Sequence, residues 1–209
     1  QVQGQLLTRA KEIIRKKQNS GIMWGWKDPR TTLFLDFWVE QLPQATFLLL
    51  YRSPWEVIDS LYRRGDLAFN YNPNFALQVW NNYNQIILEF CDRFPEQSIL
   101  TNPYSGVENI NLIINKITQD ANSTLSPLDD ISDIYDETLL NKSVDSNHRL
   151  MLIKQFFPES VELYKELVKR DYIIKDAVID NEDKIQLDDD SIRIWILQDW
   201  RSLSRAEEQ

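Results

Sequence analysis

The feature that most constrains the fold is an uninterrupted apolar run at residues 45–51 (ATFLLLY), which leads directly into a helix-start signal. A strand without polar alternation is typical of a parallel sheet that is buried on both faces. Ser53 is the predicted N-cap of the following helix, Pro54 suits its first position and Glu56 completes a capping box. Gly65 ends that helix. A buried strand followed at once by a capped helix indicates an α/β domain.

The other elements are predicted from hydrophobic periodicity and end signals. They are helices over residues 5–18, 29–41, 74–93, 107–118, 149–157 and 158–170, and strands over residues 22–27 and 98–101. This order predicts a mostly parallel sheet and a helix-rich C-terminal half. We expect one domain over residues 1–209, with a loop or insertion at 119–147 and a C-terminal extension at 176–209.

Charge and cysteine content limit the function classes. The net charge is −9, so the basic footprint of a nucleic-acid-binding protein is absent and no nucleic-acid partner is expected. Cys91 is the single cysteine, which excludes an internal disulfide and favours a reducing, cytoplasmic compartment. There is no run of eighteen apolar residues, so no membrane span is expected. An anionic ligand would need a locally positive pocket in this acidic protein.

Three residues form a candidate phosphate site at the end of the apolar strand. Arg52 lies where that strand ends, immediately before the N-terminus of the capped helix. That N-terminus offers unpaired N–H groups, and a guanidinium adds a planar donor fork that suits phosphate. Ser60 and Arg64 are four residues apart and share a helix face. The alternative for Arg52 is a structural pair with a carboxylate or a helix C-terminus.

These residues resemble the 3′-phosphate-binding motif of the sulfotransferase family. That motif is an Arg at a strand end, usually with a Pro two residues later and a Ser eight residues after the Arg; Tyr51-Arg52-Ser53-Pro54 with Ser60 matches it. Arg64, four residues further on, is similar to the tyrosylprotein branch. Lys27-Asp28-Pro29 and Leu42-Pro43-Gln44-Ala45-Thr46-Phe47 also resemble that branch.

The fuller string WGWKDPRTTLFLDFW, residues 24–38, resembles bacterial sulfotransferases of polysaccharide or glycan pathways. The resemblance covers about residues 24–104. It implies a P-loop NTPase-like three-layer αβα fold and a cofactor, 3′-phosphoadenosine-5′-phosphosulfate, which leaves as 3′,5′-adenosine bisphosphate. No metal is expected, because the donor already carries an activated sulfonate. The implied partner is a small-molecule or saccharide hydroxyl acceptor.

The resemblance also assigns roles within the site. Lys27 is the expected catalytic residue, which stabilises charge on the leaving phosphate oxygen. A general base must take the acceptor proton. The cytosolic branch has a His two residues after the matching Lys, and here that position is Pro29. Asp28 is the first candidate base, although an N-cap role is the more common use of such an Asp. His148 is a second candidate.

One family feature is missing from the sequence. Sulfotransferases hold the 5′-phosphosulfate in a Gly-rich loop after the first, central strand. The five glycines are Gly4, Gly21, Gly25, Gly65 and Gly106. None lies in such a loop, and a central strand cannot be lost without leaving backbone groups unpaired. We therefore expect these 209 residues to be part of a longer polypeptide.

Two other function classes stay open. A non-catalytic domain could use the same fold for interaction or weak nucleotide binding, and the missing loop favours it. A nucleotide kinase shares the architecture, but it needs Gly-x-x-x-x-Gly-Lys-Ser/Thr, which the sequence lacks. Five tryptophans are predicted to lie in the core, although one or two could form a sugar-stacking surface. They are Trp24, Trp26, Trp38, Trp55 and Trp80.

Overall fold

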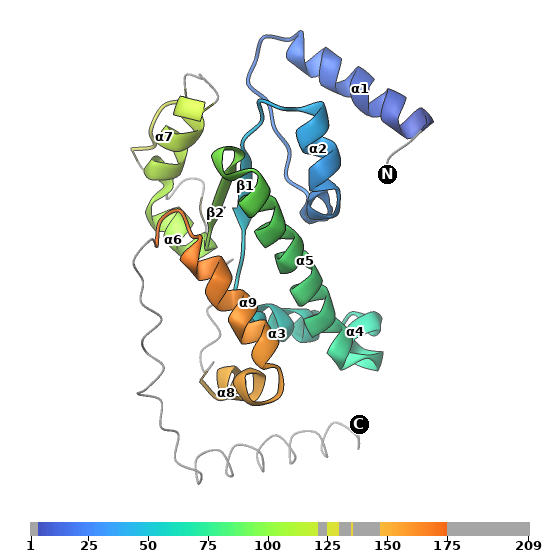
Figure 1. Cartoon of the computed structure of the whole chain (residues 1–209), viewed down its shortest axis with the longest axis vertical. Helices are drawn as coiled ribbons and strands as arrows, with labels where there is room; N and C mark the ends of the chain where they lie inside the picture. The colour runs from blue at the N-terminus through green and yellow to red at the C-terminus, as the bar shows by residue number, and fades with distance from the viewer. Residues whose placement is uncertain (1–3, 121–124, 130–134, 136–146, 175–209) are drawn as a thin grey trace.

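A computed structural model describes residues 4–120, 125–129, 135 and 147–174 of the chain (Figure 1). The elements are α1 (Gln5–Gln18), η1 (Pro29–Phe34), α2 (Leu35–Gln41), β1 (Phe47–Leu50), α3 (Pro54–Arg64), α4 (Leu67–Tyr71), α5 (Pro73–Arg93), η2 (Pro95–Gln97), β2 (Ser98–Thr101), α6 (Pro103–Glu108), α7 (Ile110–Asp120), α8 (Asn147–Phe156) and α9 (Pro158–Lys169). The η elements are 3₁₀ helices.

The described residues mix helices with a small parallel sheet, as the sequence predicts. Strands β1 and β2 pair in parallel from Phe47 opposite Ser98 to Leu50 opposite Thr101, and α3 and α5 run between them in the chain. Figure 1 shows α5 and α9 crossing one side of the two strands, with α6 and α7 beside β2. The main core joins β1 and β2 to α2, α5 and α9. Its buried members include Leu35, Val39, Phe47, Leu49, Tyr51, Trp80, Ile87, Phe90, Leu100, Leu167 and Val168.

The corner between β1 and α3 follows the predicted local signals. The Ser53 hydroxyl accepts a hydrogen bond from the Glu56 N–H at 3.4 Å and donates to the Glu56 carboxylate at 2.6 Å. Pro54 occupies the first turn of α3. Gly65 closes the helix at φ 73°, a left-handed conformation that a glycine adopts without steric cost. The cap and the closing glycine together fix both ends of α3.

Several predicted elements differ from the structure. The predicted strand at 22–27 is wrong: this segment is irregular, because no described strand lies beside it to complete a ladder, and Ile22 is 72% exposed. The predicted helix at 107–118 is two helices, α6 and α7, which meet at Asn109. The short helix α4 was not predicted. The predicted extension at 176–209 and most of the loop at 119–147 lie outside the described residues; residues 125–129 and 135 contain neither helix nor strand.

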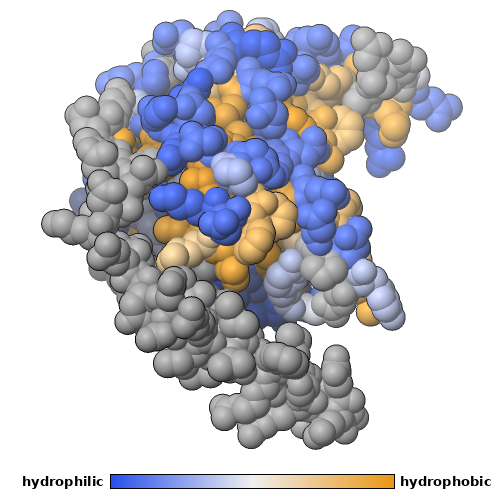
Figure 2. Space-filling view, turned by 60° about the horizontal axis from the view of Figure 1, so that its bottom comes forward, coloured by the Kyte–Doolittle hydropathy of each residue, from blue (hydrophilic) through white to orange (hydrophobic). Residues whose placement is uncertain are grey.

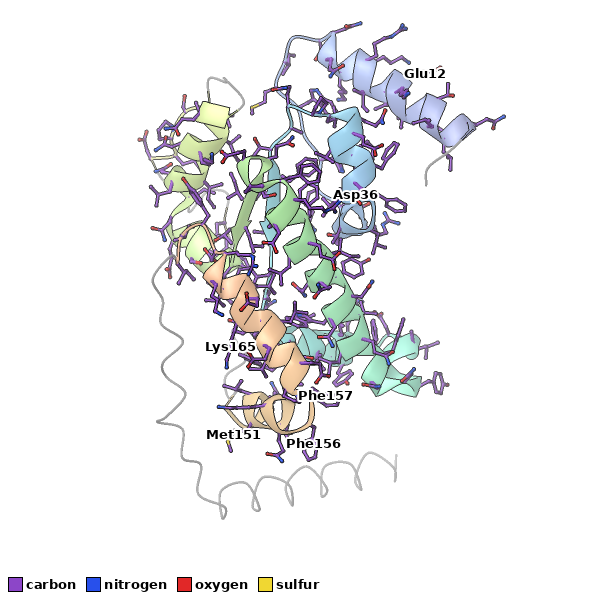
Figure 3. All side chains as sticks on the ribbon, viewed as in Figure 1. Glu12, Asp36, Met151, Phe156, Phe157 and Lys165 are labelled. Carbon is purple, nitrogen blue, oxygen red and sulfur yellow. The ribbon has the colours of Figure 1, made fainter. Side chains whose placement is uncertain are left out.

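A second, smaller cluster fixes α8 and α9 to α5. It consists of Leu77, Ile153 and Val161. Phe157, which Figure 3 labels at the junction of α8 and α9, packs against it. Cys91 lies buried on α5, and this burial raises the pKa of its thiol to about 11. None of the helices in the described ranges is long and apolar enough to cross a bilayer.

Candidate functional site

A large open cavity of about 1510 Å³ runs along β1 and carries most of the predicted site residues. Its floor is β1, one wall is the segment 21–32, and α3, α5 and α7 contribute further lining residues. Small-molecule pockets are typically about 300–1,000 Å³. This cavity exceeds that range because it includes the uncovered residues Leu48 and Leu50 of β1.

The charge around this cavity is opposite to that of the chain as a whole. Among the described residues that line it, the charged ones are Lys27, Arg52, Arg64 and Asp28. Three cations and one anion therefore face a shared space, whereas the whole chain carries −9. A concave surface with an excess of one sign concentrates ligands of the opposite sign. Arg52 and Arg64 pair with Glu56 and Asp66 just outside this lining, so the positive excess develops only when those two carboxylates release them.

Arg52 is held in a polar network at the carboxyl end of β1. Its Nη2 donates to the Tyr104 hydroxyl at 3.1 Å and lies 3.6 Å from the Glu56 carboxylate. The Trp80 indole N–H donates to the Arg52 carbonyl at 3.0 Å. The Arg52 side chain is 24% exposed, so its guanidinium is fixed in place and still reachable from the cavity. Glu56 is the carboxylate that an anionic ligand would have to displace.

Tyr104, which the sequence analysis missed, contacts Arg52 but is not among the described residues that line the cavity. It follows β2, and its hydroxyl donates to Glu56 at 3.0 Å while its ring lies 5.7 Å from the Arg52 guanidinium carbon. Burial, together with the Glu56 charge, raises the pKa of its phenol, so the hydroxyl remains a donor at neutral pH. The signal that could have found it is its position just after the second strand. The carboxyl ends of neighbouring parallel strands meet at one edge.

The other two members of the predicted phosphate cluster lie further along α3. Arg64 lines the cavity but forms an ion pair with Asp66. Ser60 is exposed and is not among the described residues that line the cavity. The structure thus brings Arg52 and Arg64 to the same space, and it leaves Ser60 outside that space.

Lys27 and Asp28 lie side by side on the opposite wall. Lys27 is exposed, and no hydrogen bond or ion pair joins its side chain to another described residue. Asp28 is the N-cap of η1, which confirms the cap prediction: its carboxylate accepts the Arg30 N–H at 2.9 Å and pairs with the Arg30 guanidinium at 2.7 Å. These hydrogen bonds from Arg30 lower the pKa of Asp28 to about 2. A carboxylate held in this way takes up a proton poorly.

Two tryptophans form an aromatic face next to Lys27. Trp24 and Trp26 stack with ring centroids 5.8 Å apart, and both line the cavity. Trp26 also packs against Trp38 at 4.7 Å and donates from its indole N–H to Thr31 at 3.0 Å. It is nevertheless 44% exposed. The core prediction therefore holds for Trp80, which is 3% exposed, and fails for Trp26.

The outer edge of β1 is open. In the described part of the chain β2 is the sole strand that pairs with β1. Leu48 and Leu50 are 43% and 52% exposed while Phe47 and Leu49 are buried, so the prediction that this strand is buried on both faces is wrong for the described chain. On the face drawn in Figure 2, hydrophobic residues are visible between hydrophilic ones. Since the Tyr51 N–H donates to Thr101 on β2, the backbone groups of Leu48 and Leu50 face the other edge. The missing strand that the sequence suggests stays a prediction.

The remaining chemistry and the comparisons add little to this site. The described residues contain no group of three or more His, Cys, Asp or Glu side chains that could hold a metal ion. The His148 side chain, the second candidate base, lies outside the described set. The chain matches no family model, no curated protein and no solved structure at a significant level. Function is therefore proposed from the geometry of the cavity and from the motif resemblance.

Proposed function

We propose that this chain carries the 3′-phosphate-binding part of a sulfotransferase, with a P-loop NTPase-like three-layer fold. The enzyme would move a sulfonate group from 3′-phosphoadenosine-5′-phosphosulfate to an acceptor hydroxyl. One observation carries the proposal: Lys27, Arg52 and Arg64, which come from two separate motifs, line one cavity that runs along β1, with Arg52 just after the carboxyl end of that strand. Open α/β sheets bind their ligands at this end of the strands.

In this proposal Arg52 binds the ribose 3′-phosphate. Its Nη2 lies 3.6 Å from the carboxylate of Glu56 in the first turn of α3, where the helix dipole also favours an anion. Tyr104 supplies a further hydroxyl donor next to it. A phosphate would replace Glu56 as the partner of Arg52, and Arg64 can contribute once Asp66 releases it. Ser60 would reach the ligand only if its hydroxyl turned toward the cavity.

Lys27 is the proposed catalytic residue. In the transfer, the acceptor oxygen forms a bond to sulfur while the bond between sulfur and the bridging phosphate oxygen breaks. Negative charge develops on that phosphate oxygen, and an ammonium aimed at it stabilises the transition state. The acceptor proton must pass to a base. Asp28 can serve as that base only after Arg30 releases it, because the ion pair lowers its pKa to about 2.

The aromatic face favours a saccharide acceptor. Trp24 and Trp26 present flat rings beside Lys27. An aromatic face carries partial negative charge and attracts the C–H groups on one side of a sugar ring. Titration of a neutral oligosaccharide, followed by tryptophan fluorescence, tests this point. Trp26→Ala should remove the response, whereas an unchanged titration would reject the aromatic face as the acceptor site.

Thermal shift with 3′,5′-adenosine bisphosphate tests the cofactor site. A ligand at about 100 times its Kd stabilises the folded state by about 2.7 kcal/mol, so the bisphosphate should raise Tm and ATP with Mg²⁺ should not. Arg52→Ala should remove the response while the unliganded Tm changes by only a few degrees. Arg63→Ala is the matched control, because Arg63 lies on the same helix and pairs with Asp59 at 3.0 Å. If both variants lost the response equally, Arg52 would not be the phosphate ligand.

A non-catalytic binding domain is the second candidate. The ion pairs of Arg52 with Glu56 and of Arg64 with Asp66 favour it, since they neutralise the cations in the absence of a ligand. Such a domain would respond to neither nucleotide. A nucleotide kinase would respond to ATP with Mg²⁺ instead.

A further inference from the structure

Asp171, just beyond α9, is a buried carboxylate that joins the ends of both strands. It is 1% exposed. Its Oδ2 accepts hydrogen bonds from the Tyr51 hydroxyl at 2.9 Å and from the Asn102 N–H at 2.8 Å. Its Oδ1 accepts from the N–H groups of Ile173 at 2.8 Å and Ile174 at 3.1 Å. One side chain therefore holds the first residue after β1 and the first residue after β2.

Each of these two residues leads directly into the candidate phosphate site. Tyr51 immediately precedes Arg52 in the chain. Asn102 is the N-cap of α6, and its side chain accepts the Tyr104 N–H at 2.9 Å. Arg52 and Tyr104 then meet through their side chains at 3.1 Å. The contact between Arg52 and Tyr104 thus depends on how the two strand ends are held.

The surroundings keep Asp171 fixed. The Tyr172 N–H donates to Leu100 on β2 at 2.7 Å, so the backbone next to Asp171 is bound to the sheet. The Tyr51 ring packs against Tyr164 of α9 with centroids 6.0 Å apart. Burial and the nearby charge of Asp171 raise the pKa of Tyr51, so its hydroxyl is a donor at all physiological pH values.

We propose that Asp171 is a positioning residue, which sets the separation of Arg52 and Tyr104 by holding the ends of β1 and β2. It touches no ligand itself. The proposal relies on the proposed function only for the identity of the ligand that Arg52 binds. The juxtaposition of the two strand ends stands on the hydrogen bonds alone.

The test compares three variants with the wild-type chain. Each carboxylate oxygen of Asp171 accepts two hydrogen bonds. Asp171→Asn replaces one of these oxygens by an amide N–H₂, which cannot accept them, and Tyr51→Phe removes one hydrogen bond. Leu167→Ala is the control, because Leu167 is a fully buried α9 residue of the main core whose side chain makes none of the hydrogen bonds at the strand ends. All measurements are made at a temperature at which every variant is folded. If Asp171→Asn fails to fold, Tyr51→Phe carries the test.

The first measurement is the Kd for 3′,5′-adenosine bisphosphate by calorimetry. Loss of hydrogen bonds to a charged group should weaken binding about tenfold in Asp171→Asn and about threefold in Tyr51→Phe. Leu167→Ala should change Kd less than about twofold, since its cavity affects global stability only. Equal losses in all three variants would overturn the proposal and assign Asp171 a purely structural role.

The second measurement needs no ligand. Amide hydrogen exchange of the Tyr51 and Tyr104 N–H groups reports the strand ends directly, through their bonds to Thr101 and Asn102. Both should exchange faster in Asp171→Asn than in Leu167→Ala at equal loss of Tm. If the wild type binds no bisphosphate, the proposed function fails, and this exchange comparison still decides the positioning role. Equal exchange in the two variants would overturn it.

Discussion

The two walls of the cavity are built very differently. At the corner between β1 and α3, Tyr51, Ser53 and Trp80 are only 1–3% exposed, and each makes a hydrogen bond that holds the chain around Arg52. Across the cavity, the segment that carries Lys27 is irregular, and Trp26 is 44% exposed. A preorganised group binds its ligand without a further cost of ordering. The first wall is thus suited to gripping a phosphate, whereas the second can adjust to an acceptor.

The largest expected difference between the walls is in stability. Trp80→Ala removes a large buried side chain and should lower the free energy of unfolding by about 3–5 kcal/mol. Trp26→Ala removes a half-exposed ring and should lower it by about 1 kcal/mol. Urea denaturation measures the free energy of unfolding of both variants. Trp80→Phe keeps an aromatic ring but removes the N–H donor, so it shows how much of the loss comes from that hydrogen bond. Similar losses at the two positions would show that the walls are equally packed.

The two walls should also differ in how much their helix caps contribute to stability, although each cap contributes less than Trp80. Ser53→Ala removes the cap of α3 together with one hydrogen-bond partner of Glu56 and should cost about 1 kcal/mol. Asp28→Ala removes the cap of η1, a short 3₁₀ helix, and should lower Tm by less than Ser53→Ala does. Thermal unfolding of the two variants in parallel is sufficient. A larger cost at Asp28 would reverse the comparison.

Lys27 should be neutral for stability. Since its side chain makes no hydrogen bond or ion pair with another described residue, Lys27→Ala should change the free energy of unfolding by less than about 0.5 kcal/mol. The same variant should weaken bisphosphate binding, because the ammonium is proposed to face the 5′-phosphate. A marked loss of stability would instead place Lys27 in a structural role.

The smallest expected effect is on the titration of Asp28, in the cavity wall formed by residues 21–32. Arg30 lowers the pKa of Asp28 to about 2, so NMR should find the midpoint there, and Arg30→Ala should return it toward 3.8. Because the folded pKa lies below the unfolded value, the contribution of this cap is present above about pH 4 and is lost as pH falls through about 2. A midpoint near 4 in the wild type would show that the pair with Arg30 does not form in solution.

Signals between residues close in the sequence predicted the ends of α3 correctly. The cap, the proline and the closing glycine of α3 all lie within thirteen residues, from Ser53 to Gly65, and the structure follows them. The segment at 22–27 has strand-like side chains, but a strand also requires a neighbour, and no described strand supplies one. The side chains of residues 22–27 therefore indicated a strand, but the backbone of this segment is irregular.

The parts that the sequence did not predict are contacts over long distances in the chain. Arg52 meets Tyr104 across 52 residues, and Tyr51 meets Asp171 across 120. Neither pair has a spacing that a helix or strand period would reveal. Such contacts depend on which strands pair and which helix covers them. Ser60 shows the reverse error, since its helical spacing from Arg64 was correct and yet it does not line the cavity among the described residues.

Cys91 gives this chain a practical advantage for spectroscopy. It is the single cysteine, and burial raises the pKa of its thiol to about 11, so almost none of the reactive thiolate exists at pH 7. A cysteine introduced at an exposed position of the 22–30 wall can therefore be labelled with a maleimide dye in the native protein while Cys91 stays unmodified. Fluorescence of that dye then reports directly whether the wall moves when a ligand is added.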